Sequence, residues 1–218
     1  MSRQLERGAL PSLTPSPGGA IAVAEAQQRS AAKPVLTRAA KRCFDLVFAA
    51  LLLIALTPVL AVLAAAIAVD SRGSPLYRQL RMGFNQRPFQ LIKLRTMDAE
   101  GRATRVGALL RPLGLDELPQ LWNVLRGDMS VVGPRPEVLE RVPGHQRNLP
   151  DYWARHLVRP GITGWAQING LRGRVSIAER LRFDLEYVAG WTLLLDARIL
   201  LRTPLAVWRD SRRAWLHR

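Results

Sequence analysis

The sequence predicts a mainly α-helical protein with one short β-hairpin, attached to a membrane near its N-terminus. Three observations support this fold class. A long uncharged apolar segment runs from Leu46 to Val69, two short extended stretches follow it at 76–82 and 89–96, and the remainder consists of helix-length stretches punctuated by Gly and Pro. The chain has 218 residues, which suits one domain with extensions.

The amino-acid composition favours some classes of function and excludes others. The chain has 32 Lys and Arg against 17 Asp and Glu, a formal net charge of +15, which favours anionic partners such as phosphates or acidic lipids. A single cysteine, Cys43, excludes an intramolecular disulfide framework and any site built from several thiolates. Three scattered histidines leave little material for a zinc site.

Residues 1–38 are predicted to form a mobile N-terminal tail. They hold several Pro, Gly, Ser and Ala residues and lack a periodic apolar stripe. We expect no cleaved presequence, because the first apolar stretch begins late and is longer than the ~7 to 15 residues of a signal core.

Residues 39–70 are predicted to form a membrane helix. The 24 uncharged residues would extend ~36 Å as a helix, enough for a bilayer core of ~30 Å. Pro58 follows Thr57 at the middle, where a proline removes a backbone hydrogen bond and bends a helix. Basic residues flank both ends, so the positive-inside tendency gives no single orientation. Two alternatives fit: a helix broken at Thr57-Pro58 that enters and leaves on one face, or one kinked transmembrane helix.

The stretches 76–82 and 89–96, separated by Gly83 to Gln86, are typical of a loose hairpin. Lys93 and Arg95 are two residues apart in the second stretch, so both should project from one face. Beyond the hairpin, helical segments are expected at 115–125, 136–142, 151–157 and 177–188. A last amphipathic segment from Trp191 to Trp208 is expected to lie along the membrane surface, with a helix packed on the domain core as the alternative.

The densest candidate for chemistry is the pair Asp116 and Glu117. Acidic residues at the start of a helix need no catalytic explanation, since Asp116 has the type and position of an N-cap. Alternatively, adjacent carboxylates can hold Mg²⁺ beside phosphate oxygens, or one can attack phosphorus while the other handles protons.

Basic residues near this pair would decide between those readings. Arg111 precedes it, and Arg135 lies between Pro134 and Pro136, which restrict its backbone and suit it to bidentate recognition of a phosphate or carboxylate. A solvated turn arginine is the alternative. The glycine-rich stretch 159–172 suits either close approach to a ligand or an irregular surface loop, and it contains no dinucleotide fingerprint or Walker loop.

Five motifs in order resemble the bacterial sugar transferase family. They are Lys93-Leu94-Arg95-Thr96-Met97, the stretch 115–124 (LDELPQLWNV), Gly127-Asp128-Met129-Ser130, the stretch 133–137 (GPRPE) and the stretch 159–167 (RPGITGWAQ). The resemblance covers about residues 40 to 208. Members of this family are monotopic polyprenyl-phosphate phosphoglycosyl transferases, which begin the synthesis of exopolysaccharide, capsule, O-antigen or glycoprotein glycans.

The resemblance implies transfer of sugar 1-phosphate from a UDP-sugar to a membrane polyprenyl phosphate such as undecaprenyl phosphate, with release of UMP and with Mg²⁺ as cofactor. It implies that Asp116 is the nucleophile, forming a covalent phosphosugar intermediate and contacting the metal, and that Glu117 is its partner. It places phosphate or nucleotide binding at Lys93, Arg95, Arg111, Pro134, Arg135, Pro136 and Arg172.

The resemblance also implies an architecture. Thr57-Pro58 matches the family's helix-breaking pair, which favours the re-entrant, one-leaflet form. A catalytic domain at 71–209 would then face the cytoplasm on the bacterial inner membrane, among membrane lipids, followed by a basic tail at 210–218; a homodimer is left open.

The sequence departs from the family pattern at three places. Leu171 stands where Arg usually follows Asn-Gly, and Arg172 comes next. The stretch 189–192 (AGWT) stands where Asn-Trp-Ser is usual, and Gln86 stands where glycine is frequent.

Two rival functions remain. The net charge would suit a membrane-tethered nucleic-acid binder. However, the cations are spread along the chain and no nucleic-acid recognition motif occurs, so we expect no nucleic-acid partner. A non-catalytic scaffold of a polysaccharide assembly complex would require that the acidic pair be dispensable.

Overall fold

The computed structural model describes residues 35–173 and 175–216. In chain order these form α2 (Val35–Asp70), β1 (Leu76–Met82), β2 (Pro88–Leu94), α3 (Arg105–Leu113), α4 (Gln120–Arg126), β3 (Ser130–Val132), α5 (Val142–Asn148), β4 (Gly161–Thr163), α6 (Trp165–Ile168), α7 (Ile177–Gly190) and α8 (Leu193–Leu216). Short 3₁₀ segments occupy Phe84–Gln86, Leu115–Glu117, Leu139–Arg141 and Pro150–Leu157. The expected mainly helical fold with one short hairpin is confirmed.

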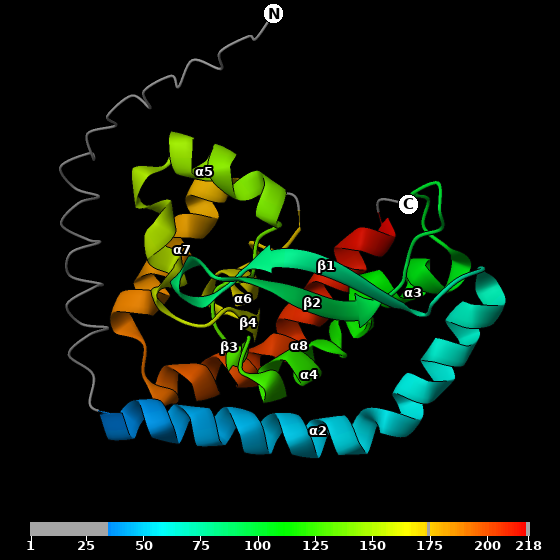
Figure 1. Cartoon of the computed structure of the whole chain (residues 1–218), viewed down its shortest axis with the longest axis horizontal. Coiled ribbons are helices and arrows are strands. Elements are labelled where there is room, and N and C mark those ends of the chain that lie inside the picture. Colours follow the sequence, from blue (N-terminus) through cyan, green and yellow to red (C-terminus); the bar gives the residue numbers. More distant parts are fainter. Residues whose placement is uncertain (1–34, 174, 217–218) are drawn as a thin grey trace, which may run out of the picture.

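Helix α2 lies along one side of the molecule, and its C-terminal part turns away from the line of its N-terminal part (Figure 1). The helix is continuous and contains Pro58. The Thr57 hydroxyl donates to the carbonyl of Leu53 at 2.8 Å, a back-bond that often accompanies helix bending. Among the described residues, α2 is the one helix that is long and apolar enough to cross a membrane.

Most apolar side chains of α2 find no cover within the protein. Within its most apolar stretch only 6% of the residues are buried, so α2 is unlike the core helix of a soluble domain. Its uncovered residues include Val47, Leu51, Ile54, Val59, Val62 and Val69. An exposed apolar surface of this length marks a contact with lipid or another apolar partner.

A buried ion network fastens α2 to the domain. The Lys41 ammonium on α2 lies 3.2 Å from the carboxylate of Asp45 on the same helix and 2.8 Å from the carboxylate of Asp196 on α8. Asp45 in turn accepts hydrogen bonds from the Ser130 hydroxyl and the Val131 amide, each at 3.0 Å. Buried charges are tolerated where they are paired and hydrogen-bonded in this way. The network therefore fixes the N-terminal half of α2 against β3 and α8.

The hairpin of β1 and β2 confirms the expected extended stretches. The strands pair antiparallel from Leu76 with Leu94 to Met82 with Pro88. Gln86 in the turn has a φ of +56°, in the left-handed region that favours glycine. The hairpin crosses the middle of the molecule, and Phe89 and Leu91 of β2 belong to the core cluster that includes Leu121 and Val124 of α4 (Figure 1).

The main core forms where α2, the hairpin, α4, β3, α7 and α8 meet. Its fully buried members include Ala49, Leu121, Val124, Val132, Tyr187 and Ile199. A second cluster joins Ile67 of α2, Leu94 of β2 and Leu110 of α3. Both halves of α2 are thus docked on the domain through one face.

Several predicted helix boundaries were wrong. Within the segment expected to be helical at 136–142, Val138 is extended and forms a bridge with Arg81, a 3₁₀ turn covers Leu139–Arg141, and α5 begins only at Val142. Pro134 and Pro136 explain this, because proline lacks the amide donor and biases the residue before it away from helix. The expected helix at 115–125 is a 3₁₀ turn followed by α4.

The chain ends also differ from the predicted domain limits. Helix α2 begins at Val35, inside the segment assigned to the tail, and α8 runs to Leu216, through most of the segment assigned to a basic tail. The rest of the predicted N-terminal tail, residues 1–34, lies outside the described residues.

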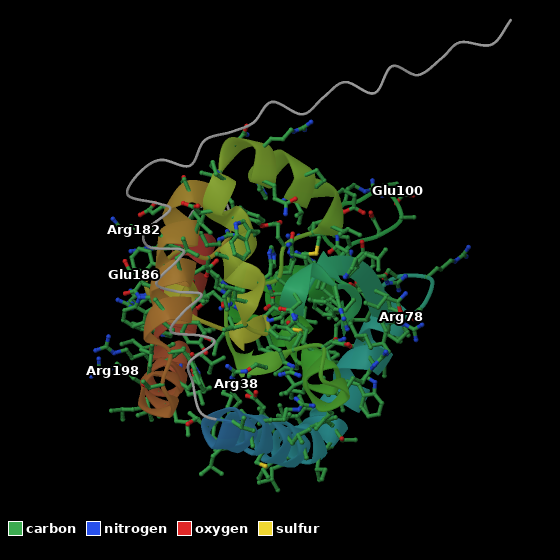
Figure 2. All side chains as sticks on the ribbon, turned by 60° about the vertical axis from the view of Figure 1, so that its left-hand side comes forward. Arg38, Arg78, Glu100, Arg182, Glu186 and Arg198 are labelled. Carbon is green, nitrogen blue, oxygen red and sulfur yellow. The ribbon has the colours of Figure 1, made fainter. Side chains whose placement is uncertain are left out.

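Arg182 and Glu186 on α7 and Arg198 on α8 extend outward together on one side of the molecule (Figure 2).

Candidate active site

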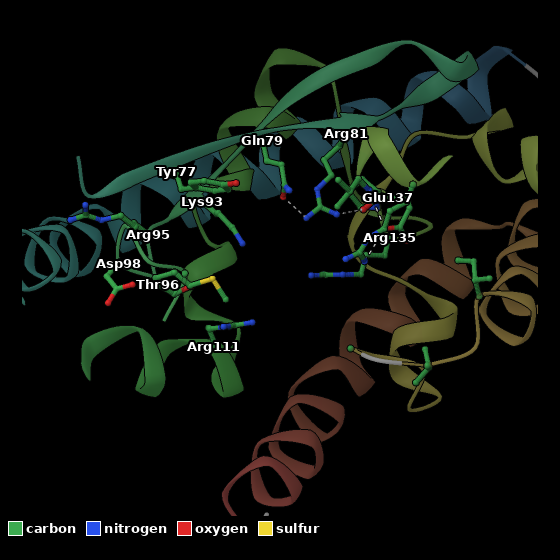
Figure 3. Close-up of a pocket in the computed structure, with 18 of the residues that line it drawn as sticks. Tyr77, Gln79, Arg81, Lys93, Arg95, Thr96, Asp98, Arg111, Arg135 and Glu137 are labelled. Atoms are coloured by element: carbon green, nitrogen blue, oxygen red, sulfur yellow. Dashed lines mark hydrogen bonds and ion pairs between the residues drawn. The ribbon is translucent and has the colours of Figure 1, made fainter. Parts of the chain in front are cut away.

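A cavity of about 840 Å³ opens beneath the hairpin, between α3 and the segment after β3 (Figure 3). Its walls are strongly cationic: among the residues that the structure describes, eight basic ones line it against two acidic ones, Asp98 and Glu137. The basic residues are Arg72, Arg81, Lys93, Arg95, Arg111, Arg135, Arg141 and Arg180. A concave site with one sign of charge concentrates anionic ligands.

Asp116 and Glu117 do not line this cavity themselves; they lie in the 3₁₀ turn between α3 and α4, near enough to its Lys93, Arg111 and Arg135 for those charges to act on Asp116. Both are buried, with exposed fractions of 6% and 9%. Gly114 ends α3 with a φ of +67°, and the 3₁₀ turn that carries the pair follows it directly. The interpretation of Asp116 as an N-cap is wrong: no side chain caps this turn or α4.

Glu117 is held by two arginines. The Arg135 guanidinium donates one hydrogen bond at 2.9 Å to one carboxylate oxygen of Glu117 and a second to the other oxygen. Arg172 lies 3.9 Å from the same carboxylate. The φ of +67° favours glycine at position 114, and a Cβ there would lie 2.5 Å from the Arg172 guanidinium, which would have to shift.

The pKa values of the Asp116 and Glu117 carboxylates shift in opposite directions. Burial raises the pKa of Asp116, and the charge of Glu117 adds to the rise, against the opposing charges of Lys93, Arg135 and Arg111. Burial also acts to raise the pKa of Glu117, but the charge and hydrogen bonds of Arg135, together with Arg172 and Lys93, lower it to about 2. Glu117 in return raises the pKa of Arg135.

The Asp116 carboxylate forms no hydrogen bond or ion pair with any residue that the structure describes, whereas that of Glu117 is engaged through both oxygens. Glu117 is therefore engaged in an ion pair with Arg135. Its neighbour Asp116 is uncommitted: its carboxylate has no hydrogen-bond or ion-pair partner among the described residues, although three cations lie near it. This asymmetry sets the pair apart from a simple helix-start pattern.

The predicted cationic residues fall into two groups. Lys93 and Arg111 point into the cavity from opposite sides (Figure 3). Arg95 lines the same cavity, but its guanidinium turns away and donates to the carbonyls of Ser71, Arg72 and Gly73 just after α2. Arg95 thus secures the end of the apolar helix, and the expectation that it projects beside Lys93 is wrong for its charged group.

Arg135 is positioned from several directions. Pro134 and Pro136 flank it, and Gly133 and Gly161 touch so closely that a Cβ on Gly161 would lie 2.0 Å from the Gly133 amide nitrogen. Arg155, which is fully buried, donates at 2.7 Å to the Arg135 carbonyl. Gly161, in the glycine-rich stretch 159–172, therefore allows close packing of two backbone segments where β3 pairs with β4.

Sequence reasoning missed two contributors. Arg81 lines the cavity and donates to the Pro136 carbonyl at 3.0 Å. Strand alternation could have found it, because Tyr77, Gln79 and Arg81 share one face of β1 and Tyr77 pairs with Lys93. Arg155 is paired with Asp184 of α7 at 2.7 Å, and no local pattern could have shown its contact with Arg135.

The residues that the structure describes include no cluster of three or more His, Cys, Asp or Glu side chains suited to a metal. Magnesium does not require one, because it commonly takes one or two carboxylates and completes its shell with water and substrate phosphates. The uncommitted carboxylate of Asp116 near the cationic cavity fits that donor set.

Comparison with known proteins gives a consistent picture. A family model described as bacterial sugar transferase matches residues 36–210. The chain is 47% identical over 184 residues to an undecaprenyl-phosphate glucose phosphotransferase of Komagataeibacter xylinus, covering 75% of this chain and 35% of that protein.

Two further relatives are named UDP-glucose:undecaprenyl-phosphate glucose-1-phosphate transferase. That of Caulobacter vibrioides is 44% identical, covering 75% of this chain and 67% of the relative. That of Escherichia coli is 40% identical, covering 77% of this chain and 40% of the relative. The chain thus spans from about a third to two thirds of the length of these relatives.

Proposed function

The chain belongs to the bacterial sugar transferase family, and we propose that it transfers sugar 1-phosphate from a UDP-sugar to undecaprenyl phosphate, with release of UMP. The observation that carries the proposal is the uncommitted, buried carboxylate of Asp116 beside the cationic cavity, next to a Glu117 that is locked to Arg135. A diphosphate donor and a phosphate acceptor are both anionic, so one basic cavity serves both.

In the first step an Asp116 oxygen attacks the β-phosphorus of the UDP-sugar. A new bond forms between the carboxylate oxygen and phosphorus while the bond from phosphorus to the bridging oxygen breaks. UMP departs with the electron pair of that bond, and the sugar phosphate stays on Asp116 as an acyl phosphate. Dividing the reaction in this way replaces one demanding step by two easier ones.

In the second step an oxygen of undecaprenyl phosphate attacks the same phosphorus. The bond to Asp116 breaks, the carboxylate is restored, and undecaprenyl-diphospho-sugar is released. Phosphoryl transfer depends chiefly on positioning and on neutralising the oxygens around phosphorus. Lys93 and Arg111 supply charge from opposite sides of the cavity, and Arg135 supplies it beside the acidic pair.

Glu117 acts as the partner that holds Arg135 in place. With a pKa near 2, this carboxylate stays ionised near neutral pH and is a weak base. Asp116 would hold Mg²⁺ together with the phosphate oxygens of the donor, and the ion would contribute further charge neutralisation when bound.

The membrane places the two substrates together. We propose that α2 inserts into the cytoplasmic face of the bacterial inner membrane and returns to that face at the bend near Thr57 and Pro58. Support comes from its uncovered apolar surface, the Thr57 back-bond and the docking of both halves on one domain. The domain then lies at the lipid surface, where undecaprenyl phosphate presents its head group.

Glucose is the sugar to test first, because the three relatives described above are named for glucose or UDP-glucose. The experiment is a UMP-release assay with purified protein in lipid micelles, Mg²⁺ and undecaprenyl phosphate across a panel of UDP-sugars. Release that requires the lipid phosphate supports the proposal. No release with any UDP-sugar, while the protein remains folded, would contradict it.

A further inference from the structure

Asn123 forms a clasp between helix α4 and strand β2. Its side-chain oxygen accepts a hydrogen bond from the Ile92 amide at 3.0 Å, and its side-chain nitrogen donates to the Gln90 carbonyl at 2.7 Å. Asn123 therefore occupies the free edge of β2 as a third strand would. The same nitrogen donates to the Asp128 carboxylate at 3.2 Å, so both polar atoms of the amide are used.

The clasp is deeply buried and specific for an amide. Asn123 has an exposed fraction of 0%, so an unmatched donor or acceptor here would lose water without replacement. A carboxylate at this position could accept from Ile92, but it would face the Gln90 carbonyl and the Asp128 carboxylate with no proton to donate. The amide satisfies all three partners at once.

The clasp joins the two segments that carry opposite charges of the site. Lys93 directly follows Ile92 on β2 and points into the cavity, whereas Asp116 and Glu117 lie in the turn that leads into α4. Lys93 is near enough to Asp116 for the charge of each to act on the other. The distance between β2 and α4 therefore sets the distance between the lysine and the acidic pair.

We propose that Asn123 is a positioning residue for the transfer reaction, which acts by holding Lys93 in register with Asp116. This inference rests on the proposed function. Asn123 is fully buried and does not line the cavity. Its contribution passes through the strand that carries Lys93, and it differs from that of a general core residue in depending on the presence of Lys93.

A double-mutant cycle tests this dependence. Lys93→Met and Asn123→Ala should each lower kcat/KM for the UDP-sugar by about 10- to 100-fold, the scale of a small misplacement in an active site. The double variant should lie within about threefold of Lys93→Met, because once the lysine charge is gone its position no longer matters. Losses that multiply in the double variant would overturn the proposal.

A second variant and a matched control guard against a folding defect. Asn123→Ser retains a hydroxyl able to satisfy one of the two β2 groups, so its activity should fall between wild type and Asn123→Ala. Gln167→Ala removes another buried amide, which donates to the Ile162 carbonyl at 2.9 Å away from the cavity, and should change kcat/KM by less than about threefold. An equal loss in Gln167→Ala would overturn the proposal.

Hydrogen exchange separates this inference from the proposed function. The Ile92 amide should exchange at least about tenfold faster in Asn123→Ala than in wild type, while amides on the β1 side of the hairpin keep their protection. Unchanged exchange at Ile92 would refute the clasp whatever the activity. Faster exchange at Ile92 in Asn123→Ala, together with no UMP release by the wild type, would leave the clasp standing and refute the proposed function instead.

Discussion

Arg135 donates to both carboxylate oxygens of Glu117, directly beside the uncommitted carboxylate of Asp116. Two adjacent acids in one turn thereby acquire opposite shifts in pKa, upward for Asp116 and down to about 2 for Glu117. The difference assigns them different tasks, because the paired acid fixes an arginine while the unpaired acid remains available to a phosphorus centre.

The Glu117 pair should make stability depend on pH in the acid range. The folded-state pKa of Glu117, about 2, lies below its ordinary value of 4.5, so its stabilisation is fully present above pH 4.5 and is lost as pH falls toward 2. A shift of this size corresponds to a contribution of order 3 kcal/mol. Thermal midpoints of wild type and Glu117→Gln in detergent should differ most near neutral pH and converge near pH 2. Parallel curves would refute the pairing of Glu117 with Arg135.

Arg135→Lys should weaken donor binding. The ammonium keeps the charge but loses the planar fork that holds Glu117, so donor affinity should fall by about 1 to 3 kcal/mol. The effect should appear as a raised KM for the UDP-sugar with little change in the dependence on undecaprenyl phosphate. Arg182→Lys, on the outer side of α7, serves as a control with unchanged kinetics. A change in the acceptor dependence alone would assign Arg135 to the lipid phosphate instead.

The re-entrant form of α2 predicts that both of its flanks face the cytoplasm. Single cysteines would replace Ser30, which precedes the described residues, and Arg147, which is exposed on α5, in a Cys43→Ser background. An impermeant maleimide should label both in inside-out vesicles and neither in right-side-out vesicles. Labelling of the Ser30 position from the periplasmic side would show a through-going span. The labelling is needed because the positive-inside tendency does not distinguish the two ends of α2.

Helix α8 should rest on the lipid surface through its outer face. Leu194, Leu201, Leu205, Trp208 and Trp215 are exposed along it, whereas Trp191 is buried and donates to Asp196 at 3.0 Å. Exposed Trp and Leu beside arginines favour the head-group layer. Lipid-attached quenchers should therefore reduce the fluorescence of a variant that retains only Trp208, and not that of one retaining only Trp191. Equal quenching of both would contradict this orientation.

The sequence predicted elements whose signals are local. The hairpin follows from two alternating stretches around a turn, and α7 follows from the spacing of apolar residues between Ile177 and Gly190. The helix expected at 136–142 starts later than predicted, because the prolines at 134 and 136 and a bridge from Val138 to Arg81 outweigh helix propensity before Leu139. The parallel pairing of β3 with β4 is long-range, and three-residue strands carry no periodic signal.

The site was predicted in its residue types more than in its contacts. Resemblance to the family picked out Asp116, Glu117, Arg135 and Lys93, and the structure gathers them. It could not show that Arg95 binds backbone carbonyls after α2, that Arg172 reaches Glu117, or that Arg155 supports Arg135. Those contacts join segments distant in sequence, and the identity of an arginine does not reveal whether it binds a phosphate or a backbone carbonyl.

The central claim is that the uncommitted carboxylate of Asp116 performs the transfer, and Asp116→Asn tests it most directly. An amide cannot form the phosphosugar bond, so UMP release in the presence of undecaprenyl phosphate should fall by at least about a thousandfold. The thermal midpoint should not fall, because burial already disfavours the charge that the substitution removes. Sugar-labelled donor, given without acceptor, should label wild type and not Asp116→Asn. UMP release at the wild-type rate by purified Asp116→Asn would contradict the account.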